Sequence, residues 1–365
     1  MRAKWVEQAN APEMACAGPW SEACAAWWQH PRDHRLRDHV AAQLFMTDEE
    51  LSAWHSAAFD RASLLRAHTH VTTTRMATEG NSLHRRFTAS TLRSTLVVSH
   101  QRTGATTEYA RAEELPGLLE QVASTYAALP SHPFLRAAWI VQAVGAVHPF
   151  VDQNGGTCRL LSSIELTRER LPPFVLTGLQ RNTGYVEAII AADADLTLLL
   201  HVVHNVVQQQ LANVLANTPP VTGWTEHSRE LAATWTAHAD AAWRSAASIE
   251  VERDLGSLDS FLRRGYHIPL RPEPHVVRWS SDHPIPIQFH LAITPVLAGD
   301  AVWTIGSVVA TVGEDGTLAP IHDNEPIAAV FVAAPTEPQA IASARFSHWL
   351  AKRIEQSVRG LAAWM

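Results

Sequence analysis

The first half of the chain is patterned for helices. TDEELSAWHSAAFDRASLLRAH spaces its apolar residues three and four apart, and Thr47 with Glu50 forms the signature of a helix start. The segment FLRAAWIVQAVGAV at 134–147 is apolar almost all round, which is typical of a helix buried in a bundle. Further helical patterns cover TCRLLSSIELTRERL and most of 182–216.

Two other stretches carry a strand pattern. RSTLVVSH and TTEYA flank the turn-like sequence QRTGA, so they predict a β-hairpin within 91–110. After two more helical patterns within 221–265, short β-branched runs alternate with clusters of Pro, Gly and Asp between 268 and 334, which is typical of a sheet. A last amphipathic helix follows from Pro338.

These patterns predict a mainly α protein: a helical core with a β-hairpin, followed by a smaller α+β domain. The expected division is an N-terminal helical region at 1–70, a core at 71–216 and a C-terminal α+β domain at 221–365, with NTPP at 217–220 as the linker. A length of 365 residues accommodates two domains, or one large domain with appendages.

Composition narrows the class of protein. Apolar residues make up 46% of the chain and charged residues only 18%, which allows a sizeable core and argues against wholesale disorder. The net charge of −7 argues against a general nucleic-acid binder, which needs a basic surface. Three cysteines without a CxxC spacing argue against a disulfide framework or a structural zinc site. Because there is neither a signal-peptide pattern nor a run of about 18 apolar residues, we expect a cytoplasmic protein without a membrane partner.

One short stretch, HPFVDQNGGTCR at 148–159, concentrates residues with chemical potential between two helical patterns. We expect the first helix to end near Val147 and the next to begin near Thr157, with DQNGG as the loop and its glycines making the turn. The N–H groups at the start of the second helix favour an anion. Arg159 in its first turn can add a charge-assisted contact to a phosphate oxygen.

The other polar residues of this stretch suit metal and proton chemistry. Asp152 can hold a hard cation such as Mg²⁺, which keeps most of its waters and needs few protein ligands. His148, at the other edge of the loop, can accept a proton from a hydroxyl. Together these are the parts of a nucleotidyl-transfer site. Spacing alone leaves a structural alternative open, in which His148 caps a helix, Asp152 pairs with Arg159 and the glycines only form a turn.

HPFVDQNGGTCR resembles the signature HPFx(D/E)GNGRxxR of the Fic (Fido) family. The matching positions are His148, Pro149, Phe150, Asp152, Asn154, Gly155 and Arg159. The stretch departs from the signature at Gln153, where the family has glycine, and at Gly156, where the family has its first arginine. The resemblance covers the region from about 70 to 215, and the predicted hairpin lies where the family carries a flap that positions the target.

The resemblance implies an enzyme, because family members mostly transfer AMP from ATP to a Ser, Thr or Tyr hydroxyl of a target protein. By this resemblance His148 is the base that deprotonates the hydroxyl, and Asp152 holds Mg²⁺. Two alternatives stay open. The missing arginine at Gly156 favours a catalytically weakened binding or regulatory protein with the same fold. Gln153 and Gly156 together favour a related transferase that uses a different phosphate-ester donor.

The resemblance also implies a set of nucleotide-binding residues. Asn154 and Gly155 would line the anion hole around the α-phosphate, and Gly156 would follow them. Arg159 would grip the distal phosphates. Tyr185 matches the tyrosine of the family's downstream helix, which implies packing by the nucleoside; a role as a core aromatic stays open as the alternative.

Many family members carry an inhibitory helix with the pattern (S/T)xxxE(G/N). RMATEGN offers Glu79 and Gly80, but Arg75 stands at the Ser/Thr position. Glu79 is therefore a candidate inhibitory residue that would pair with Arg159 and block the triphosphate, and a solvated turn is the alternative. The expected partners are a nucleotide and a target protein, with target docking or homo-oligomerisation as functions of the C-terminal domain.

Overall fold

The computed structural model describes ten segments of the chain: 14–79, 91–100, 106–176, 185–216, 224–246, 249–252, 275–281, 287–312, 317–318 and 328–362. These segments group into two compact units. The first unit is built mainly from 37–175 and 184–204, and the second from 14–36 and the described residues beyond 204. The segment 14–36 therefore groups with the C-terminal half of the chain. The linker expected at 217–220 lies outside the described residues.

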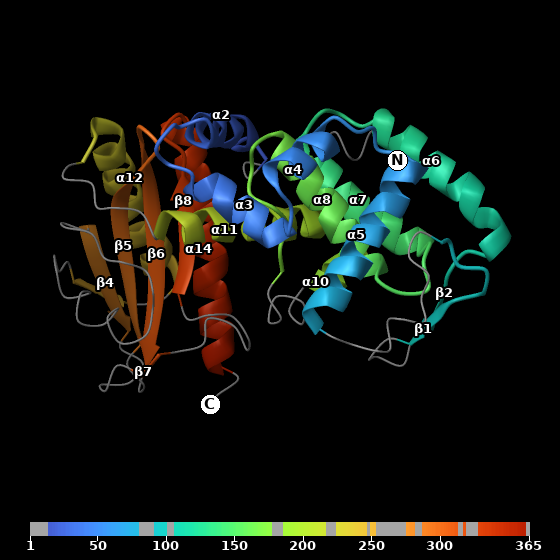
Figure 1. Cartoon of the computed structure of the whole chain (residues 1–365). Helices are drawn as coiled ribbons and strands as arrows, with labels where there is room; N and C mark the ends of the chain where they lie inside the picture. Colours follow the sequence, from blue (N-terminus) through green and yellow to red (C-terminus); the bar gives the residue numbers. More distant parts are fainter. Residues whose placement is uncertain are drawn as a thin grey trace. The chain divides into compact units, whose positions relative to one another are not determined.

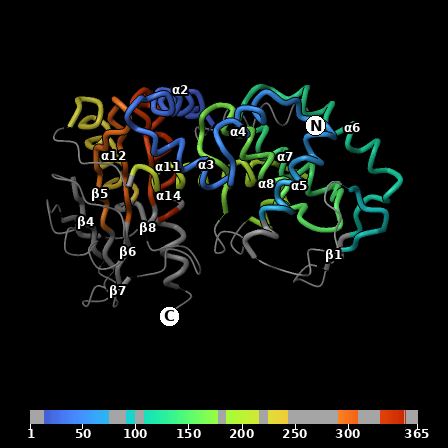
Figure 2. The backbone as a smooth tube through the Cα atoms, in the orientation of Figure 1, coloured from blue at the N-terminus to red at the C-terminus, as the bar shows by residue number. Residues whose placement is uncertain are grey.

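The first unit is helical, as its sequence pattern predicts. Its helices are α4 (Asp48–His55), α5 (Arg61–Glu79), α6 (Leu115–Ala127), α7 (Pro133–Val147), α8 (Asn154–Arg168) and α10 (Tyr185–Ala191), with the 3₁₀ turn η2 (Ala112–Glu114) before α6. Two further helices, α3 (Arg35–Leu44) and α11 (Thr197–Ala216), run through the boundaries between the units. The apolar helix α7 is buried along most of its length. It lies beside α8, which α5 contacts as well (Figures 1 and 2).

The start of α4 confirms the predicted capping box. The Glu50 N–H donates to the Thr47 hydroxyl at 3.2 Å, and the Glu50 carboxylate accepts from the Thr47 N–H at 2.8 Å. The single helix expected over 47–68 is wrong, because a second start follows. There the Ser63 N–H donates to the Asp60 carboxylate at 2.7 Å, which caps the start of α5. Helix α5 then continues through the polar stretch that follows the predicted helix.

The predicted hairpin is confirmed. Its strands β1 (Val98–His100) and β2 (Thr106–Glu108) pair antiparallel, with Val98 opposite Glu108. Below the paired strands, the Tyr109 N–H donates to the Val97 carbonyl at 3.1 Å and extends the pairing toward the helical core. The hairpin therefore reaches the core through an ordered base rather than through a loose loop.

The second unit combines helices with an antiparallel sheet, which agrees with the predicted α+β class. Its described strands are β3 (Ile249–Glu252), β4 (His275–Ser281), β5 (Ile287–Ala298), β6 (Ala301–Val312), β7 (Thr317–Leu318) and β8 (Ala328–Ala333). They form an antiparallel sheet in the order β3-β4-β5-β6-β7, with β8 also paired to β6. Within 221–265 only the first of the two expected helices is described, as α12 (Glu226–Ala246); IEVE forms strand β3 instead.

One face of this sheet is covered by α12 and α14 (Gln339–Ala362), which Figure 1 shows against the strands. Trp235 of α12 and Phe346 of α14 stack with ring centroids 4.7 Å apart, and Phe331 of β8 meets Trp235 edge-on. The start of α14 is fixed by an ion pair between the fully buried Arg345 and Glu337, with 2.7 Å between Nε and Oε1.

The N-terminal helix α2 (Ala17–Trp28) belongs to this second unit. Its Trp20 indole N–H donates to Glu337 at 3.1 Å, and Trp27 lies against Trp303 of β6 with ring centroids 6.2 Å apart. Trp20 and Trp27 therefore anchor α2 to the rest of this unit. Among the described residues, no helix combines the length and the apolar character that a membrane crossing requires.

Candidate active site

The stretch HPFVDQNGGTCR joins α7 to α8 through two left-handed residues. His148 ends α7 at φ 50°, and its N–H donates to the Val144 carbonyl at 3.0 Å. Gln153 directly precedes α8 at φ 60°. In this conformation the Cβ atom crowds the following carbonyl oxygen, which costs on the order of 1–2 kcal/mol for a residue other than glycine. Backbone strain of this kind persists where surrounding contacts enforce it, often at functional sites.

The glycines do not make the turn, contrary to the expectation from sequence. Helix α8 begins at Asn154 rather than near Thr157, so Gly155 and Gly156 already lie in its first turn. The Thr157 N–H donates to the Gln153 carbonyl at 2.9 Å. The N–H groups before it have no acceptor within the helix, because the first turn of any α-helix lacks preceding carbonyls. This end of α8 is therefore suited to an anion.

Asn154 holds the loop closed. Its side-chain amide donates to the Phe150 carbonyl at 2.7 Å, and its side-chain oxygen accepts from the Phe150 N–H at 2.9 Å. Both ends of this buried amide are thus used within the chain. If Asn154 binds an α-phosphate, its backbone N–H is the group in a position to do so, and the side chain instead sets the curvature of the loop.

Asp152 is half-buried, and its two carboxylate oxygens both accept from Gln153. Oδ1 accepts from the backbone N–H at 2.7 Å, and Oδ2 accepts from the side-chain Nε2 at 3.0 Å. In the described part of the chain, no cluster of three or more His, Cys, Asp or Glu could enclose a metal ion. A single carboxylate beside the start of a helix fits Mg²⁺, which retains waters and takes few protein ligands. Asp152 is the residue that would hold it.

The imidazole of His148 is half-buried and stacks on Tyr109 at the base of the hairpin, with ring centroids 4.0 Å apart and an interplanar angle of 22°. Burial lowers the pKa of His148 and nearby Arg93 lowers it further, whereas a backbone hydrogen bond at Gly145 and the charge of Asp152 oppose the shift. A lowered pKa keeps the ring neutral at pH 7, which is the form that accepts a proton.

Arg93, which the sequence did not single out, ties the hairpin to this histidine. Its side chain is 3% exposed and donates Nε to the His148 carbonyl at 2.7 Å. It also donates to the carbonyls of Thr95, at 2.9 Å, and Ala110, on the two arms of the hairpin. Its backbone N–H donates to the Pro149 carbonyl at 3.0 Å. One buried guanidinium therefore joins both arms of the hairpin to the end of α7.

Helix α5 packs against the other side of the motif. The ring of His68 stacks on Phe150 with centroids 3.9 Å apart, and its Nε2 lies 3.2 Å from the Asp152 carbonyl oxygen. Burial lowers the pKa of His68, so the ring is neutral and donates from Nε2. A Cβ atom on Gly156 would lie 2.6 Å from Cγ1 of Val71. Helix α5 therefore fills the space into which a side chain at position 156 would extend.

Arg159 and Tyr185 meet at the same first turn of α8. A Cβ atom on Gly155 would lie 3.2 Å from Nη1 of Arg159, so the guanidinium lies over that glycine. Tyr185 is buried at the start of α10, beside Cys158 and Arg159, and burial raises the pKa of its hydroxyl. No described residue lies in hydrogen-bonding geometry with that hydroxyl. Packing near a nucleoside and packing as a core aromatic both remain consistent with this placement.

Glu79 is the last residue of α5. Its side chain and the following Gly80 lie outside the described residues, so an inhibitory contact with Arg159 stays a prediction. The site that the described residues bring together consists of His148, Asp152, Asn154, Gly155, Gly156, Arg159 and Tyr185. To it the structure adds Arg93, His68 and Val71, which come from segments distant in sequence.

Comparisons with known proteins show which family and which solved structures this chain is similar to. The model of the Fic/DOC family matches residues 45–166. A similar solved structure is a Fic family protein from Desulfovibrio desulfuricans G20, with 17% identity, 64% of this chain and 70% of that chain covered, and a TM-score of 0.35. Another is a Fic domain containing signaling protein from Bacteroides thetaiotaomicron VPI-5482, with 16% identity, 58% of this chain and 93% of that chain covered, and a TM-score of 0.33. No curated protein matches the chain.

The matched range begins just before α4, includes the hairpin and α5 to α7, and ends within α8. It thus contains the motif loop together with the helices that hold it. Over residues 45–166 the chain is therefore similar to the Fic/DOC family.

Proposed function

We propose that the protein transfers a nucleotide monophosphate, most directly AMP from ATP, to a hydroxyl of a target protein in a Mg²⁺-dependent reaction. The observation that carries this proposal is the geometry of one loop. Left-handed His148 ends one helix, left-handed Gln153 starts the next, and the Asn154 amide closes the loop between them. A neutral base and an anion-binding helix end are thereby held at the two sides of one short loop.

The transfer follows from these residues. The neutral imidazole of His148 takes the proton of the target hydroxyl as its oxygen forms a bond to the α-phosphorus, and the bond from that phosphorus to the pyrophosphate oxygen breaks. The N–H groups at the start of α8 receive the negative charge on the α-phosphate. Arg159 offers a cation to the distal phosphates. A Mg²⁺ ion at Asp152 would offset the charge of the phosphate oxygens.

The hairpin supports a role in presenting the target. A two-stranded hairpin has edges with backbone N–H and C=O groups, along which an extended segment of a partner can align. Arg93 and Tyr109 connect the base of this hairpin to His148. A target segment placed along the hairpin would thus bring its hydroxyl toward the imidazole.

The test is incubation of the purified protein with labelled ATP, CTP, GTP and UTP, Mg²⁺ and a cell lysate as the source of acceptors. Labelled protein is expected with at least one nucleotide. His148→Ala is the matched control: it should lower the labelling rate by about 10²–10⁴-fold, the usual contribution of a general base. The fold and the nucleotide affinity should stay close to wild type. Labelling at the wild-type rate by His148→Ala would refute this role of the histidine.

A second candidate is a binding or regulatory protein that retains the fold but has weak or no transfer activity. Two observations favour it: Val71 closes the space at Gly156, and Gln153 donates to both oxygens of Asp152. Calorimetry separates the candidates. Binding of ATP without labelling of any acceptor supports the regulatory protein, whereas labelling from CTP, GTP or UTP but not from ATP supports a transferase with a different donor.

A further inference from the structure

Gln153 and Gly156, the two departures from the family signature, are neighbours in space. The side-chain oxygen of Gln153 lies 3.4 Å from the place where a Cβ atom of Gly156 would be. Its side-chain nitrogen lies 3.0 Å from Oδ2 of Asp152. The carboxamide therefore extends from beside the first turn of α8 to the carboxylate.

The surrounding protein holds the side chain of Gln153 against Asp152. Gln153 is 8% exposed, so its amide is enclosed by protein rather than free to exchange with solvent. Its backbone nitrogen also lies 2.7 Å from Oδ1 and donates to it. Each oxygen of the Asp152 carboxylate thus receives a hydrogen bond from the same residue. Such charge-assisted bonds are stronger than bonds between neutral groups.

We propose that Gln153 caps the Asp152 carboxylate and thereby lowers the affinity of this site for a divalent cation. A hard cation binds carboxylate oxygens directly, so it has to displace the Gln153 amide from Oδ2 or share the carboxylate with it. A chain with glycine at this position has no such amide. The inference rests on the proposed function, which places the cation at Asp152.

Gly156 lies beside the cap. A Cβ atom at position 156 would lie 2.6 Å from Cγ1 of Val71 but 3.4 Å from the Gln153 oxygen, so it would clash with helix α5 and make only an ordinary contact with the carboxamide. The two departures from the signature are therefore neighbours, and the cap itself depends on Gln153.

The experiment is a titration of the full chain with Mn²⁺, in which the electron paramagnetic resonance signal measures free Mn²⁺. Gln153→Met keeps the length of the side chain and removes the donor. It is expected to bind Mn²⁺ roughly ten- to a hundredfold more tightly than wild type, the equivalent of one hydrogen bond to a charged group. Gln142→Met is the control, because Gln142 of α7 also donates its side-chain amide to an aspartate, Asp193, at 3.0 Å, but on the surface. It should leave Mn²⁺ affinity unchanged.

Asp152→Asn completes a double-mutant cycle. In the Asp152→Asn background, Gln153→Met should no longer change Mn²⁺ affinity. An equal affinity of wild type and Gln153→Met, or a weaker one in the variant, would overturn the cap while leaving a cation site at Asp152 in place. If neither protein binds Mn²⁺ at millimolar concentration, with or without ATP, both the cap and the cation site of the proposed function are overturned. Circular dichroism and the melting temperature of each variant establish that it is folded.

Discussion

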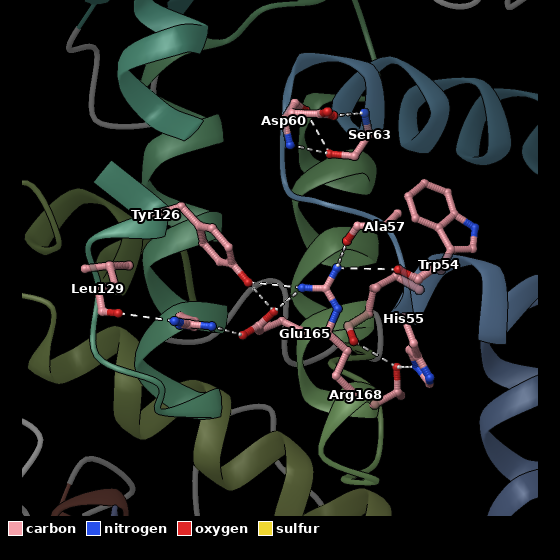
Figure 3. Close-up of polar contacts among 12 residues, drawn as sticks. Trp54, His55, Ala57, Asp60, Ser63, Tyr126, Leu129, Glu165 and Arg168 are labelled. Carbon is pink, nitrogen blue, oxygen red and sulfur yellow. Dashed lines mark hydrogen bonds and ion pairs between the residues drawn. The ribbon is translucent and has the colours of Figure 1, made fainter. Parts of the chain in front are cut away.

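The two ends of α8 satisfy their polar groups in opposite ways. At the C-terminal end, the buried Glu165 accepts from the Tyr126 hydroxyl at 2.6 Å and from Arg168 at 2.9 Å, as Figure 3 shows. Arg136 lies 3.6 Å from its other oxygen. Arg168 continues to the Ala57 carbonyl at 2.6 Å. Helices α6 and α7 and the segment after α4 are thereby fixed to this end of α8.

At the N-terminal end, the same helix starts from a strained residue and leaves backbone donors without acceptors inside the helix. Gln153 is left-handed, and the N–H groups of the first turn point toward the loop rather than toward preceding carbonyls. The side chains of Asn154 and His68 hold this end by acting on the loop: Asn154 bonds to Phe150, and His68 contacts Asp152 and Phe150.

The C-terminal end of α8 therefore anchors the helix, whereas the N-terminal end forms part of the candidate site. A strained start persists only if other contacts determine the position of the helix, and the network around Glu165 provides such contacts. Substitutions at the C-terminal end should therefore change the free energy of unfolding and leave ligand affinity alone. Substitutions at the N-terminal end should change ligand affinity more than stability.

The largest expected effect on stability is that of Glu165→Ala. It leaves Arg136 and Arg168 near each other without their carboxylate, and breaking a buried ion pair on one side costs about 3–5 kcal/mol. Both arginines are partly exposed, with 22% and 24% of their side chains accessible, so the lower end of that range applies. Urea denaturation measures this change. Tyr126→Phe, which removes a single hydrogen bond, should cost less.

Glu165→Ala also tests the comparison directly. At a temperature where the variant is folded, its ATP affinity by calorimetry should equal that of wild type. A large loss of ATP affinity in the folded variant would mean that the two ends of α8 are not separable, and that the anchor also sets the geometry of the loop.

Gly156→Ala should destabilise the protein by about 1–3 kcal/mol, the usual cost of overpacking. The new Cβ atom would lie 2.6 Å from Cγ1 of Val71, and a β-branched side chain on a helix has little rotational freedom to move away. Val71→Ala should relieve the contact, so that the double variant is more stable than Gly156→Ala alone. If Gly156→Ala stabilises the protein, as alanine does at ordinary helix positions, the packing argument fails.

Lower pH should destabilise the helical unit through imidazoles at both ends of α8. Burial, aided by Arg170 and Arg168, lowers the pKa of His55 to about 4; its Nε2 lies 3.0 Å from the Thr167 hydroxyl. The pKa of His148 is also lowered. The unfolded chain, with ordinary values near 6.5, then binds more protons than the folded one, so stability falls as the pH drops from about 6.5 toward 4.

The matching measurement is the melting temperature as a function of pH for wild type and His55→Gln. The variant lacks one of these groups, so its melting temperature should fall less steeply between pH 6.5 and 4. Partial exposure of the imidazole limits the effect, because solvent screens its charge. An identical slope in both proteins would show that His55 does not contribute to the acid destabilisation.

The sequence predicts well those parts of the fold that depend on local signals. The capping box at Thr47 and the apolar run of α7 are both confirmed. The break between α4 and α5 is missed because the apolar spacing continues across it, while Asp60 forms a new cap. Strand β3 is missed because four residues, IEVE, are too few to show a period.

The candidate site divides in the same way. The spacing from His148 to Arg159 is a local signal. It suffices to predict that these residues lie together in a loop between two helices. Arg93, His68 and Val71 act on that loop through packing between distant segments, for which a single sequence has no signal. The left-handed turn at Gln153 could not be inferred either, because that conformation favours glycine, and two glycines stand a few residues further on.

The smallest expected effect concerns this conformation, and α8 offers a matched control for it. Arg170, just beyond the other end of the helix, is also left-handed at φ 62°. Its N–H donates to the Thr167 carbonyl at 3.0 Å and the Leu171 N–H donates to the Leu166 carbonyl at 3.2 Å, the pattern of a Schellman cap. Left-handed backbone alone therefore occurs at both ends, but only Gln153 also contacts a candidate metal ligand.

We therefore expect Gln153→Gly to be more stable than Gln153→Ala by about 1 kcal/mol, because both lose the carboxamide and only glycine relieves the strain. Arg170→Gly and Arg170→Ala should differ in the same direction by a similar amount. This order is the reverse of that at an ordinary helix position, where alanine is favoured by about 1 kcal/mol. Chemical denaturation of the four variants measures it. Equal stability of the alanine and glycine variants at position 153, with the expected difference at 170, would mean that Gln153 is not held in a strained conformation in solution.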